Sequence, residues 1–289
     1  MPFSTFAIAG VGNIGSFITE ELLKQKDAGK AAEVVVLTRS TSTNDATKEL
    51  AAKGAKIAPV DYTSKASLTA ALAGVEVVIC TFSHLFLEGE QILAEAAKAA
   101  GARLFVPSEF GNPTENAEHG PLVAKKNFQG KLREIGLPYA LFFTGPWTDF
   151  CFVGFMGLDL TSGKVIAGGD GNVPISWTSR RDVGRFVAYA LTTLPSEKIA
   201  GRTFRVEGER ASLNEIYKAY EAKTGKKLEV TYKSIPDLQT AFASNPQDIA
   251  SILHFAWALG GGVVGKVEDV TNGEFPAFNP GKVLEVLKV

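Results

Sequence analysis

The apolar residues in the first half of the chain follow two alternating spacings. Short runs of apolar and β-branched residues occupy positions 5–9, 33–37, 56–60, 76–80, 103–106 and 139–143. Between these runs, apolar residues recur at the three- and four-residue spacing of amphipathic helices, over 14–26, 44–53, 67–73, 89–100 and 122–135. Strands that alternate with helices of this length predict crossover connections and a parallel sheet. The strand runs are apolar on both faces, which indicates a sheet covered by helices on both sides.

The pattern in the second half is less regular. Two strand-like runs, 164–167 and 173–176, flank the residues GGDGN, and we expect a hairpin whose glycines take positive φ. Helical spacing returns at 180–194, and Ser212 followed by Glu215 is typical of a capping box at the start of another helix. Further elements are expected as strands at 203–206 and 228–232, two short helices within 236–259, and a flexible glycine loop at 260–265.

The turn between the first strand and the first helix carries glycines at an informative spacing. The residues AIAGVGNIGS place Gly10, Gly12 and Gly15 in the pattern G-x-G-x-x-G, after a predicted strand and before a predicted helix. These glycines allow a tight turn and a close approach of the backbone to a pyrophosphate, which the helix N-terminus stabilises. We therefore expect a dinucleotide site that includes Asn13 and Ile14 of this loop. A plain glycine turn is the alternative interpretation.

The order of the elements and the glycine loop together predict an α/β fold of the Rossmann type, with a doubly wound parallel sheet. The chain has 289 residues and contains no long linker. We expect a nucleotide-binding domain at 1–145 and a smaller C-terminal substrate lobe at 146–289. The lobe is expected to pack on the first domain and to return some segments to the sheet.

The end of the second strand distinguishes between the two nicotinamide dinucleotides. An NAD site usually has an acidic residue there, which binds the ribose hydroxyls. This strand instead ends with Thr38, Arg39 and Ser40. A guanidinium can bind the 2′-phosphate of NADP through two hydrogen bonds, and Lys48 on the next helix could add a second positive charge. The sequence favours NADP(H) over NAD(H), and a solvated surface arginine is the alternative.

Polar and aromatic residues also follow the next two strands. Ligands of such sheets lie at the carboxyl ends of the strands. We therefore expect Asp61 and Tyr62 at the edge of the adenine pocket, and Thr81, Phe82 and Ser83 beside the ribose and the nicotinamide. Phe82 is equally compatible with simple core packing, because aromatic side chains are often buried.

The fifth strand ends in the residues VPSEFG at 106–111. We expect Pro107 to end the strand, and Ser108 and Glu109 to brace the following turn next to the cofactor. The carboxylate of Glu109 is expected to accept backbone N–H bonds within that turn. Phe110 then leads the chain over the nicotinamide end of the cleft, where it is also a candidate substrate contact.

Hydride transfer to a carbonyl or a conjugated alkene leaves an oxyanion, which needs a proton donor or an electrophile. None of the six tyrosines has a lysine four residues later, so the usual Tyr-x-x-x-Lys pair is absent. Lys125 and Lys126 instead lie in the first two turns of the helix at 122–135, where the helix dipole and the neighbouring cation disfavour the charged ammonium. A proton-donating lysine and a pair of solvated lysines are both compatible with these residues. His84 and His119, in rim loops, are weaker candidates.

Aromatic residues are concentrated after the sixth strand. Trp147 and Phe150 follow a Gly-Pro turn and are candidates for a flat apolar substrate pocket, and His84 is a further candidate substrate contact. Simple burial in the core is the alternative for most of the aromatic residues in this run.

Composition and charge disfavour several other classes of function. The net charge is −1, and the cations are spread along the chain, so no nucleic-acid surface is indicated. Cys80 and Cys151 lie in apolar runs without metal-ligand spacing, so we expect no disulfide framework, no metal and a reducing, cytoplasmic location. No apolar run reaches the roughly 18 residues of a membrane span, and the N-terminus reads as a strand rather than a signal peptide.

Several of these motifs together resemble one known family. LTR at 37–39, VPSEFG, GLPY at 136–139 and GDGN at 169–172 are similar to the isoflavone reductase-like group of the NmrA-like, atypical short-chain dehydrogenases. The resemblance extends over most of the chain. It implies an NADPH-dependent reductase of phenylpropanoid-like, isoflavonoid-like or quinone-like aromatic compounds, acting as a monomer or a homodimer. It also leaves open the family's other role, a redox-sensing regulator that binds NADP without turnover.

The resemblance also implies particular residue roles. The family's catalytic lysine lies fourteen residues before the tyrosine of its GIPY-like motif, which selects Lys125 over Lys126. Its contacts to the 2′-phosphate correspond to Arg39 and Lys48, and its segment after the sixth strand, here Gly145, Pro146 and Trp147, faces the nicotinamide. The chain departs from the family at Ala9 and Val11 of the glycine loop, and at the Gly-Pro-Trp segment itself.

Overall fold

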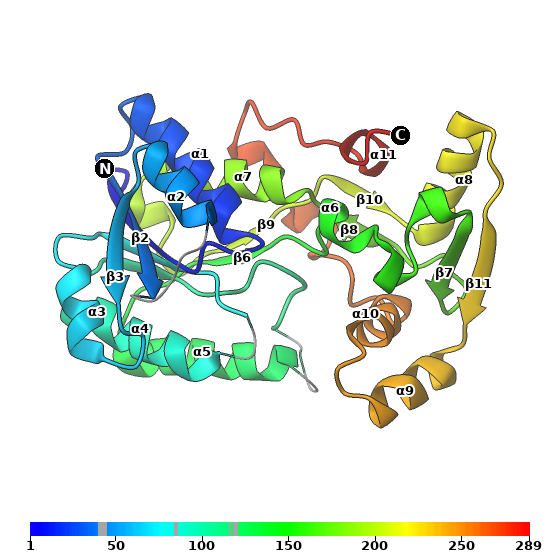
Figure 1. Cartoon of the computed structure of the whole chain (residues 1–289), viewed down its shortest axis with the longest axis horizontal. Coiled ribbons are helices and arrows are strands. Elements are labelled where there is room, and N and C mark those ends of the chain that lie inside the picture. Colours follow the sequence, from blue (N-terminus) through cyan, green and yellow to red (C-terminus); the bar gives the residue numbers. More distant parts are fainter. Residues whose placement is uncertain (40–44, 84–85, 116, 118–120) are drawn as a thin grey trace.

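The protein consists of an α/β body and a lobe that lie side by side (Figure 1). The structure, a computed structural model, describes residues 1–39, 45–83, 86–115, 117 and 121–289. Elements from the first half of the chain form most of the body, and elements from the second half form the lobe. Among the described residues, no helix is both long enough and apolar enough to cross a membrane.

A parallel sheet of five strands lies at the centre of the body, in the order β3-β2-β1-β4-β5. Its strands are β1 (Thr5–Ala9), β2 (Glu33–Arg39), β3 (Lys56–Val60), β4 (Val77–Cys80) and β5 (Leu104–Val106). A parallel bridge between Phe105 and Tyr139 brings β6 (Leu141–Phe143) beside β5, and β9 (Thr203–Arg205) pairs in parallel with β6. The predicted parallel sheet and fold class are confirmed.

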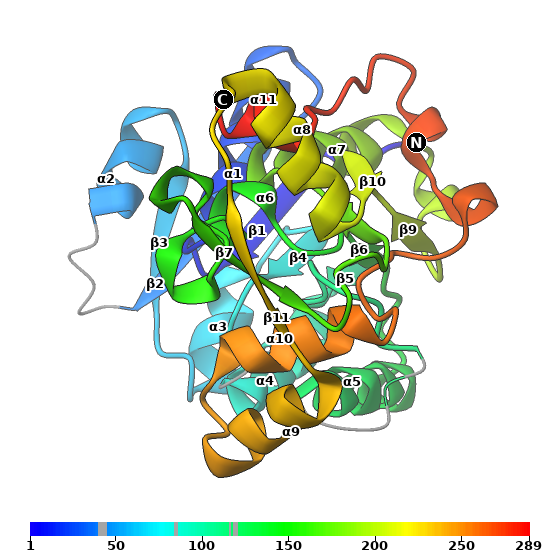
Figure 2. The same cartoon turned by 90° about the vertical axis from the view of Figure 1, so that its right-hand side faces the viewer.

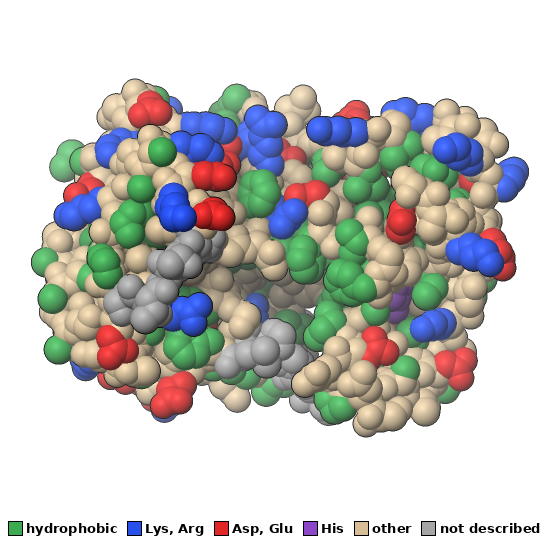
Figure 3. Space-filling model, in the orientation of Figure 1, with side chains coloured by type: hydrophobic (Ala, Val, Ile, Leu, Met, Phe, Trp, Pro, Cys, Tyr) green, Lys and Arg blue, Asp and Glu red, His purple; other side chains and the backbone are tan. Residues whose placement is uncertain are grey.

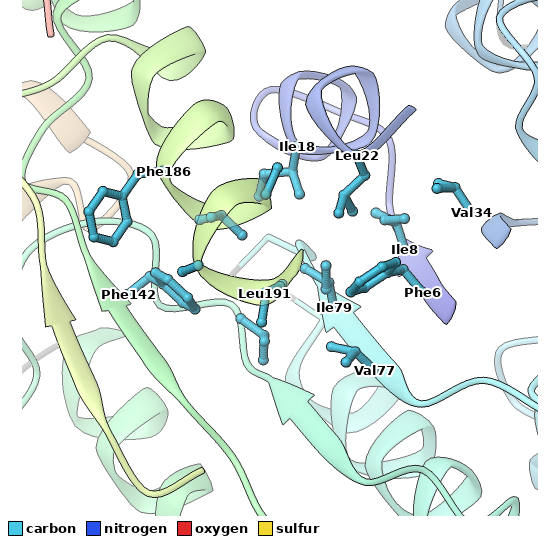
Figure 4. Close-up of a cluster of buried hydrophobic side chains, with 14 of the residues drawn as sticks. Phe6, Ile8, Ile18, Leu22, Val34, Val77, Ile79, Phe142, Phe186 and Leu191 are labelled. Carbon is cyan, nitrogen blue, oxygen red and sulfur yellow. The ribbon is translucent and has the colours of Figure 1, made fainter. Parts of the chain in front are cut away.

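Alternate residues of each strand point to opposite faces of the sheet, and apolar side chains on both faces are covered by helices. Phe6 and Ile8 of β1 belong to one core cluster, and Ala7 and Ala9 belong to the other. Figure 4 shows part of the first cluster, where side chains of the strands meet those of two helices. The first face is covered by α1 (Gly15–Asp27), α2 (Asp45–Ala52) and α7 (Arg180–Thr193), and the second by α3 (Lys65–Ala71), α4 (Leu87–Ala99) and α5 (Pro121–Ile135).

Segments from the second half of the chain complete the body. Helix α7 packs along α1 so closely that a Cβ at Gly184 would lie 2.7 Å from the carbonyl oxygen of Phe17. Phe186 and Leu191 of α7 are buried in the same cluster as Ile18 of α1 (Figure 4). Residues 180–193 and 203–205 therefore belong to the body in space, and the division at residue 145 stays a prediction.

The lobe is built around small two-stranded sheets (Figure 2). Trp177 lies at its centre, with ring centroids 4.9 Å from Phe152 and 5.4 Å from Trp257. Ser212 and Glu215 form the predicted capping box. The strands are β7 (Lys164–Gly168), β8 (Ile175–Trp177), β10 (Glu209–Ala211) and β11 (Glu229–Lys233), and the helices are α6 (Thr148–Cys151), α8 (Leu213–Thr224), α9 (Ile235–Ser244), α10 (Ile249–Ala258) and α11 (Val283–Val286).

The hairpin predicted over residues 164–176 is wrong. β7 pairs in parallel with β11, and β8 pairs antiparallel with β10. Gly169 and Gly171 do take positive φ, at +63° and +73°. A residue of another element stabilises this turn. The side-chain amide of Asn214 on α8 donates hydrogen bonds to the backbone carbonyl of Asp170 and to the side chain of Asn172. The strands on either side of this turn therefore separate and bury their side chains against different partners.

The glycine loop at 260–265 also differs from the flexible segment that was expected. The amide of Ser176 donates to the carbonyl of Gly262 at 3.0 Å, and the amide of Val264 donates to the Ser176 hydroxyl at 3.1 Å. Val264 is fully buried, and a Cβ at Gly262 would lie 2.9 Å from the Trp257 ring. The glycines here serve close packing against the lobe core.

The contact between α1 and α7 gives a test with a matched control. Gly184→Ala should destabilise the protein by about 1–3 kcal/mol, because the added methyl group meets the Phe17 carbonyl in a close-packed interface. Gly130→Ala, inside α5, should instead stabilise it by up to about 1 kcal/mol, because only the end of Arg133 lies near the new methyl group. Urea unfolding of both variants measures the difference. Equal midpoints for the two variants would contradict the packing described here.

Candidate functional site

A cleft of about 760 Å³ opens where the strands of the central sheet end. The surface in Figure 3 is also visibly hollowed between the body and the lobe, with hydrophobic side chains along the lobe side. Among the residues expected from the sequence, those that line the cleft are Gly10, Gly12, Thr38, Arg39, Asp61, Tyr62, Phe82 and Ser83. Sequence reasoning missed others in its walls, namely Val11, Leu37, Thr47, Val60, Thr63 and Phe86.

The three glycines of the loop have three different structural roles. Gly10 has φ +94°, which permits the turn out of β1. A Cβ at Gly15 would lie 1.9 Å from the carbonyl oxygen of Gly10, so only glycine lets α1 start against the strand. A Cβ at Gly12 would have no neighbour within 4 Å, so the backbone there borders open space. The loop therefore exposes backbone N–H groups and the start of α1 to the cleft.

Neighbouring residues fix this loop. The hydroxyl of Thr81, after β4, donates to the carbonyl oxygens of Gly10 and Ala9. Ile14 is 4% exposed and packs into the core, whereas Asn13 is exposed. Thr81 and Ile14 hold the loop in place, and Gly12 and Asn13 are the exposed residues within it.

Three aromatic side chains form an apolar wall of the cleft. Tyr62 and Phe82 make an edge contact with ring centroids 5.1 Å apart, and Phe86 lies 5.2 Å from Phe82. The Tyr62 hydroxyl donates to the carbonyl of Leu37 at 2.8 Å, and burial raises the pKa of Tyr62 well above its usual value. The wall is therefore uncharged and suits the face of a flat heterocycle.

The same cleft is also lined by a cation and by a buried hydroxyl. Arg39 is exposed at the end of β2. Thr47 is 9% exposed, and its hydroxyl has no hydrogen-bond partner among the described residues. Lys48 forms an exposed ion pair with Asp45 at 2.9 Å, which holds it only weakly. A guanidinium beside a buried, unpaired hydroxyl suits an anionic oxygen, and Ser40 lies outside the described residues.

The two candidate lysines point to different places. The ammonium of Lys125 donates to the carbonyl oxygen of Ser108 at 2.5 Å, and the Ser108 hydroxyl donates to the carbonyl of Phe82 at 2.7 Å. Lys126 instead donates to the carbonyl of Ala117 at 3.2 Å. Through Ser108, Lys125 is therefore linked to the aromatic wall of the cleft. His84 and His119 lie outside the described residues.

Glu90 is a buried carboxyl group at this site that sequence reasoning missed. It is 3% exposed, and one oxygen accepts the backbone N–H of Ser108 at 2.8 Å. Burial raises the pKa of Glu90, while the Ser108 N–H and the charge of Lys125 oppose that rise. The signal was available in the sequence, because Glu90 lies three and four residues before Leu93 and Ala94, on the apolar face of its helix.

Glu109 is the second buried carboxyl group near Lys125. It is 2% exposed, and one oxygen accepts from the side-chain amide of Gln129 at 2.6 Å and from the Thr114 hydroxyl at 3.1 Å. These side-chain partners replace the backbone N–H partners expected from the sequence. Burial raises the pKa of Glu109, and the charge of Lys125 opposes the rise. One ammonium thus acts on two buried carboxyl groups, and the second oxygen of Glu109 has no partner among the described residues.

The aromatic run after β6 leads from the turn toward the surface. Gly145 has φ +63°, and a Cβ there would lie 1.9 Å from the carbonyl oxygen of Ser176. The turn through Gly145 and Pro146 leads to Trp147, whose ring centroid lies 5.8 Å from that of Phe150. Phe150 lies 6.4 Å from Phe155, which is 66% exposed.

Two further contacts define the surroundings of this run. Arg180 stacks on Phe150, with its guanidinium carbon 5.7 Å from the ring centroid, and forms an ion pair with Asp149. Phe110 is 5% exposed and stacks on Phe142 in the core.

In the described ranges, no group of three or more His, Cys, Asp and Glu side chains could hold a metal ion.

Comparison with known proteins gives consistent matches over most of the chain. The model of the NmrA-like family matches residues 5–267. Phenylcoumaran benzylic ether reductase PT1 from Pinus taeda is 28% identical over 258 residues, which cover 83% of this chain and 80% of that protein. An isoflavone reductase homolog from Solanum tuberosum is 29% identical over 279 residues, covering 88% and 86%.

Solved structures match the fold at lower identity. The NADPH complex of leucoanthocyanidin reductase from Vitis vinifera has a TM-score of 0.85 at 22% identity, with 98% of each chain covered. The NADPH complex of a quinone oxidoreductase from Escherichia coli has a TM-score of 0.80 at 21% identity, also with 98% of each chain covered. At these identities, the likeness shows that the fold is shared.

The buried carboxyl group of Glu109 makes a pH-dependent prediction. Its pKa is raised above the usual 4.5, so the folded state holds a proton that the unfolded state releases as the pH rises above that value. This group should therefore reduce stability progressively as pH increases from 4.5 toward its raised pKa. Glu109→Gln removes the titration, so the stability of the variant relative to the native protein should rise over the same window. Thermal unfolding of both proteins from acid to neutral pH measures their stability difference. A difference that does not change with pH would contradict the raised pKa of Glu109.

Proposed function

The chain belongs to the NmrA-like family, and we propose that it is an NADPH-dependent reductase of small aromatic compounds. The observation that carries this proposal is the link from Lys125 through Ser108 to Phe82. This link supports a role for Lys125 as a proton donor beside the cleft, which is lined by the glycine loop, the aromatic wall and Arg39. The relatives named above, an ether reductase and an isoflavone reductase homolog, support the same reaction class.

The cleft residues fit the parts of NADPH. The open backbone at Gly12 and the start of α1 suit the pyrophosphate. In the aromatic wall, Tyr62 and Phe86 suit the adenine, and Phe82, which is linked through Ser108 to Lys125, suits the ribose and the nicotinamide. Arg39 and the unpaired hydroxyl of Thr47 suit the 2′-phosphate, which is the group that distinguishes NADP from NAD. Two solved relatives that share the fold are complexes with NADPH, which supports this assignment.

Lys125 is assigned the proton transfer. NADPH, when bound, supplies the hydride. The ammonium of Lys125 is the acid that protonates the resulting anion or the departing oxygen. The Ser108 carbonyl holds the amine in place, and Glu90 holds the backbone of Ser108. Lys125 also faces the two buried carboxyl groups, and its charge opposes the rise that burial causes in the pKa of Glu90 and of Glu109.

The aromatic run is assigned the substrate. Trp147 and Phe150 provide flat apolar surface next to the Gly145 turn, and Phe155 extends it to the exterior. The relatives include a phenylcoumaran benzylic ether reductase, an isoflavone reductase and an NADPH-dependent quinone oxidoreductase. We therefore propose lignan-like ethers, isoflavonoid-like enones and quinones as the compounds to test.

Turnover distinguishes the reductase from an NADP-binding regulator. The protein should oxidise NADPH in the presence of at least one aromatic enone, quinone or benzylic ether. The loss of NADPH absorbance measures this reaction. NADPH binding without oxidation by any compound of such a panel would favour the regulator, in which the same cleft reports the redox state to a partner.

Replacement of the lysine tests its role. Lys125→Ala should lower kcat by a factor of about 10²–10⁴, because general acid catalysis contributes on that scale. The dissociation constant for NADPH, measured by fluorescence, should change far less. Lys126→Ala is the matched control, since Lys126 points to Ala117, and it should keep native turnover. Full activity in Lys125→Ala would overturn the assignment of the proton donor.

Replacement of the arginine tests the choice of cofactor. Arg39→Ala should weaken binding of NADPH by about 1.5–3 kcal/mol, the range of hydrogen bonds to charged groups, and should leave NADH binding nearly unchanged. Calorimetric titration of both dinucleotides measures the two effects. An equal loss for NADPH and NADH would show that Arg39 does not bind the 2′-phosphate.

A further inference from the structure

Strand β11 lies at the outer edge of the lobe, on the side away from the body (Figures 1 and 2). It pairs in parallel with β7, from Glu229 opposite Lys164 to Lys233 opposite Gly168. No other strand among the described residues pairs with it. A strand edge of this kind presents unpaired backbone groups to solvent and is a template for another strand.

The pairing with β7 determines which backbone groups remain free. The amide of Glu229 donates to Gly163 at 2.8 Å, and the carbonyl of Lys233 accepts from Gly169 at 2.9 Å. In a parallel ladder, alternate residues turn their N–H and C=O groups toward the same neighbour. Glu229, Thr231 and Lys233 therefore face β7, and the N–H and C=O groups of Val230 and Tyr232 face outward.

We propose that β11 pairs antiparallel with β11 of a second copy of this chain, about a two-fold axis at Thr231. Val230 of one copy then exchanges two hydrogen bonds with Tyr232 of the other, and the same pair recurs across the axis. Glu229 of each copy lies opposite Lys233 of the other. The two β7–β11 pairs become one continuous four-stranded sheet.

Charge selects this register among the symmetric alternatives. The outward-facing residues allow two-fold axes at Val230, Thr231 or Tyr232. An axis at Val230 places Lys227 opposite Lys233 of the second copy, and an axis at Tyr232 places Lys233 opposite Thr231. An axis at Thr231 forms two ion pairs and also pairs an aromatic with a β-branched side chain. Opposite charges and aromatic pairs across strands each stabilise by about 0.2–1 kcal/mol, and like charges destabilise.

Of the side chains concerned, Glu229 and Tyr232 are exposed and Lys233 is half-buried. Glu229 forms an ion pair with Lys164 at 3.5 Å, but the two side chains are 71% and 78% exposed, so this pair holds Glu229 weakly. Tyr232 is 52% exposed. A single charge on an edge strand repels the same charge on a second copy and so prevents pairing. The β11 sequence EVTYK instead carries opposite charges at equal distances on either side of Thr231, and these attract each other when two copies pair antiparallel.

The short strand limits the strength of the contact. Interfaces of stable dimers bury about 1,200–2,000 Å², and five paired residues in each copy supply only part of such an area. We therefore expect a reversible dimer whose population increases with protein concentration. The dimer should also weaken as salt is added, because exposed ion pairs are screened.

Charge exchange tests the register directly. Glu229→Lys and Lys233→Glu each convert both ion pairs into like-charge pairs, so each variant alone should show a dissociation constant about tenfold or more above that of the native protein. The double variant E229K/K233E restores opposite charges and should recover the native dissociation constant. A mixture of the two single variants should form a heterodimer, because each supplies the charges that the other lacks. Sedimentation over a wide range of concentration measures all four cases.

The controls separate charge from folding. Lys233 also acts on Asp248 and His254 near α10, so Lys233→Glu changes that local contact. Glu229→Lys leaves it unchanged and loses only the weak, exposed ion pair with Lys164. Circular dichroism of each variant shows whether it folds. A native protein that is monomeric at every concentration, or a dimer unaffected by both single variants, would overturn the proposal. The readout is molecular mass, so the outcome is independent of the proposed reductase activity.

Discussion

The absence of a side chain at Gly15 is the constraint on which the arrangement of the body depends. With the Gly10 carbonyl 1.9 Å from the position of a Cβ, α1 can start directly against the end of β1. The start of the helix then faces the cleft, where its unpaired N–H groups are available to an anion. A second close approach, of Gly184 to the carbonyl oxygen of Phe17, packs α7 from the second half of the chain on α1. The missing side chains at Gly15 and Gly184 thus orient the glycine loop and anchor the second half of the chain to the first.

Ser108 connects the two chemical parts of the site. Its N–H donates to buried Glu90, its hydroxyl donates to the carbonyl of Phe82, and its carbonyl accepts from Lys125. Buried carboxyl groups are costly unless they are hydrogen-bonded or face a cation. Glu90 and Glu109 meet this requirement through Ser108, Gln129 and the nearby ammonium. The VPSEFG segment is therefore a junction that holds the lysine beside the cleft, which is consistent with the supporting role expected for it.

The strand pairing and the core of the lobe differ from those of the body. Its strands occur in separate pairs, and its core is organised around Trp177 and its aromatic neighbours. This leaves β11 with a free edge, far from the proposed chemistry. The aromatic run from Trp147 to Phe155 contacts both parts of the molecule, because Phe152 packs on Trp177 in the lobe core and Phe150 contacts Arg180 at the start of α7.

Much of the body could be predicted from the sequence, because periodicity and glycine spacing are local properties of the chain. The strand pattern led to the parallel sheet, and the spacing of Gly10, Gly12 and Gly15 led to the loop at its edge. The residues alone did not separate Lys125 from Lys126. The resemblance selected Lys125, and the structure shows that only this lysine reaches Ser108.

Tertiary structure decided the contacts that join distant positions. Ser108 meets Glu90 from 18 residues away, and Glu109 meets Gln129 from 20 residues away. Helical spacing marks Glu90 as an acid on an apolar helix face, but it does not identify Ser108 as its partner, and no local pattern marks Gln129. The strand pairs of the lobe differ from the predicted hairpin for the same reason. A turn sequence specifies local backbone angles, but the partner of a strand is determined by which side chains can be buried together.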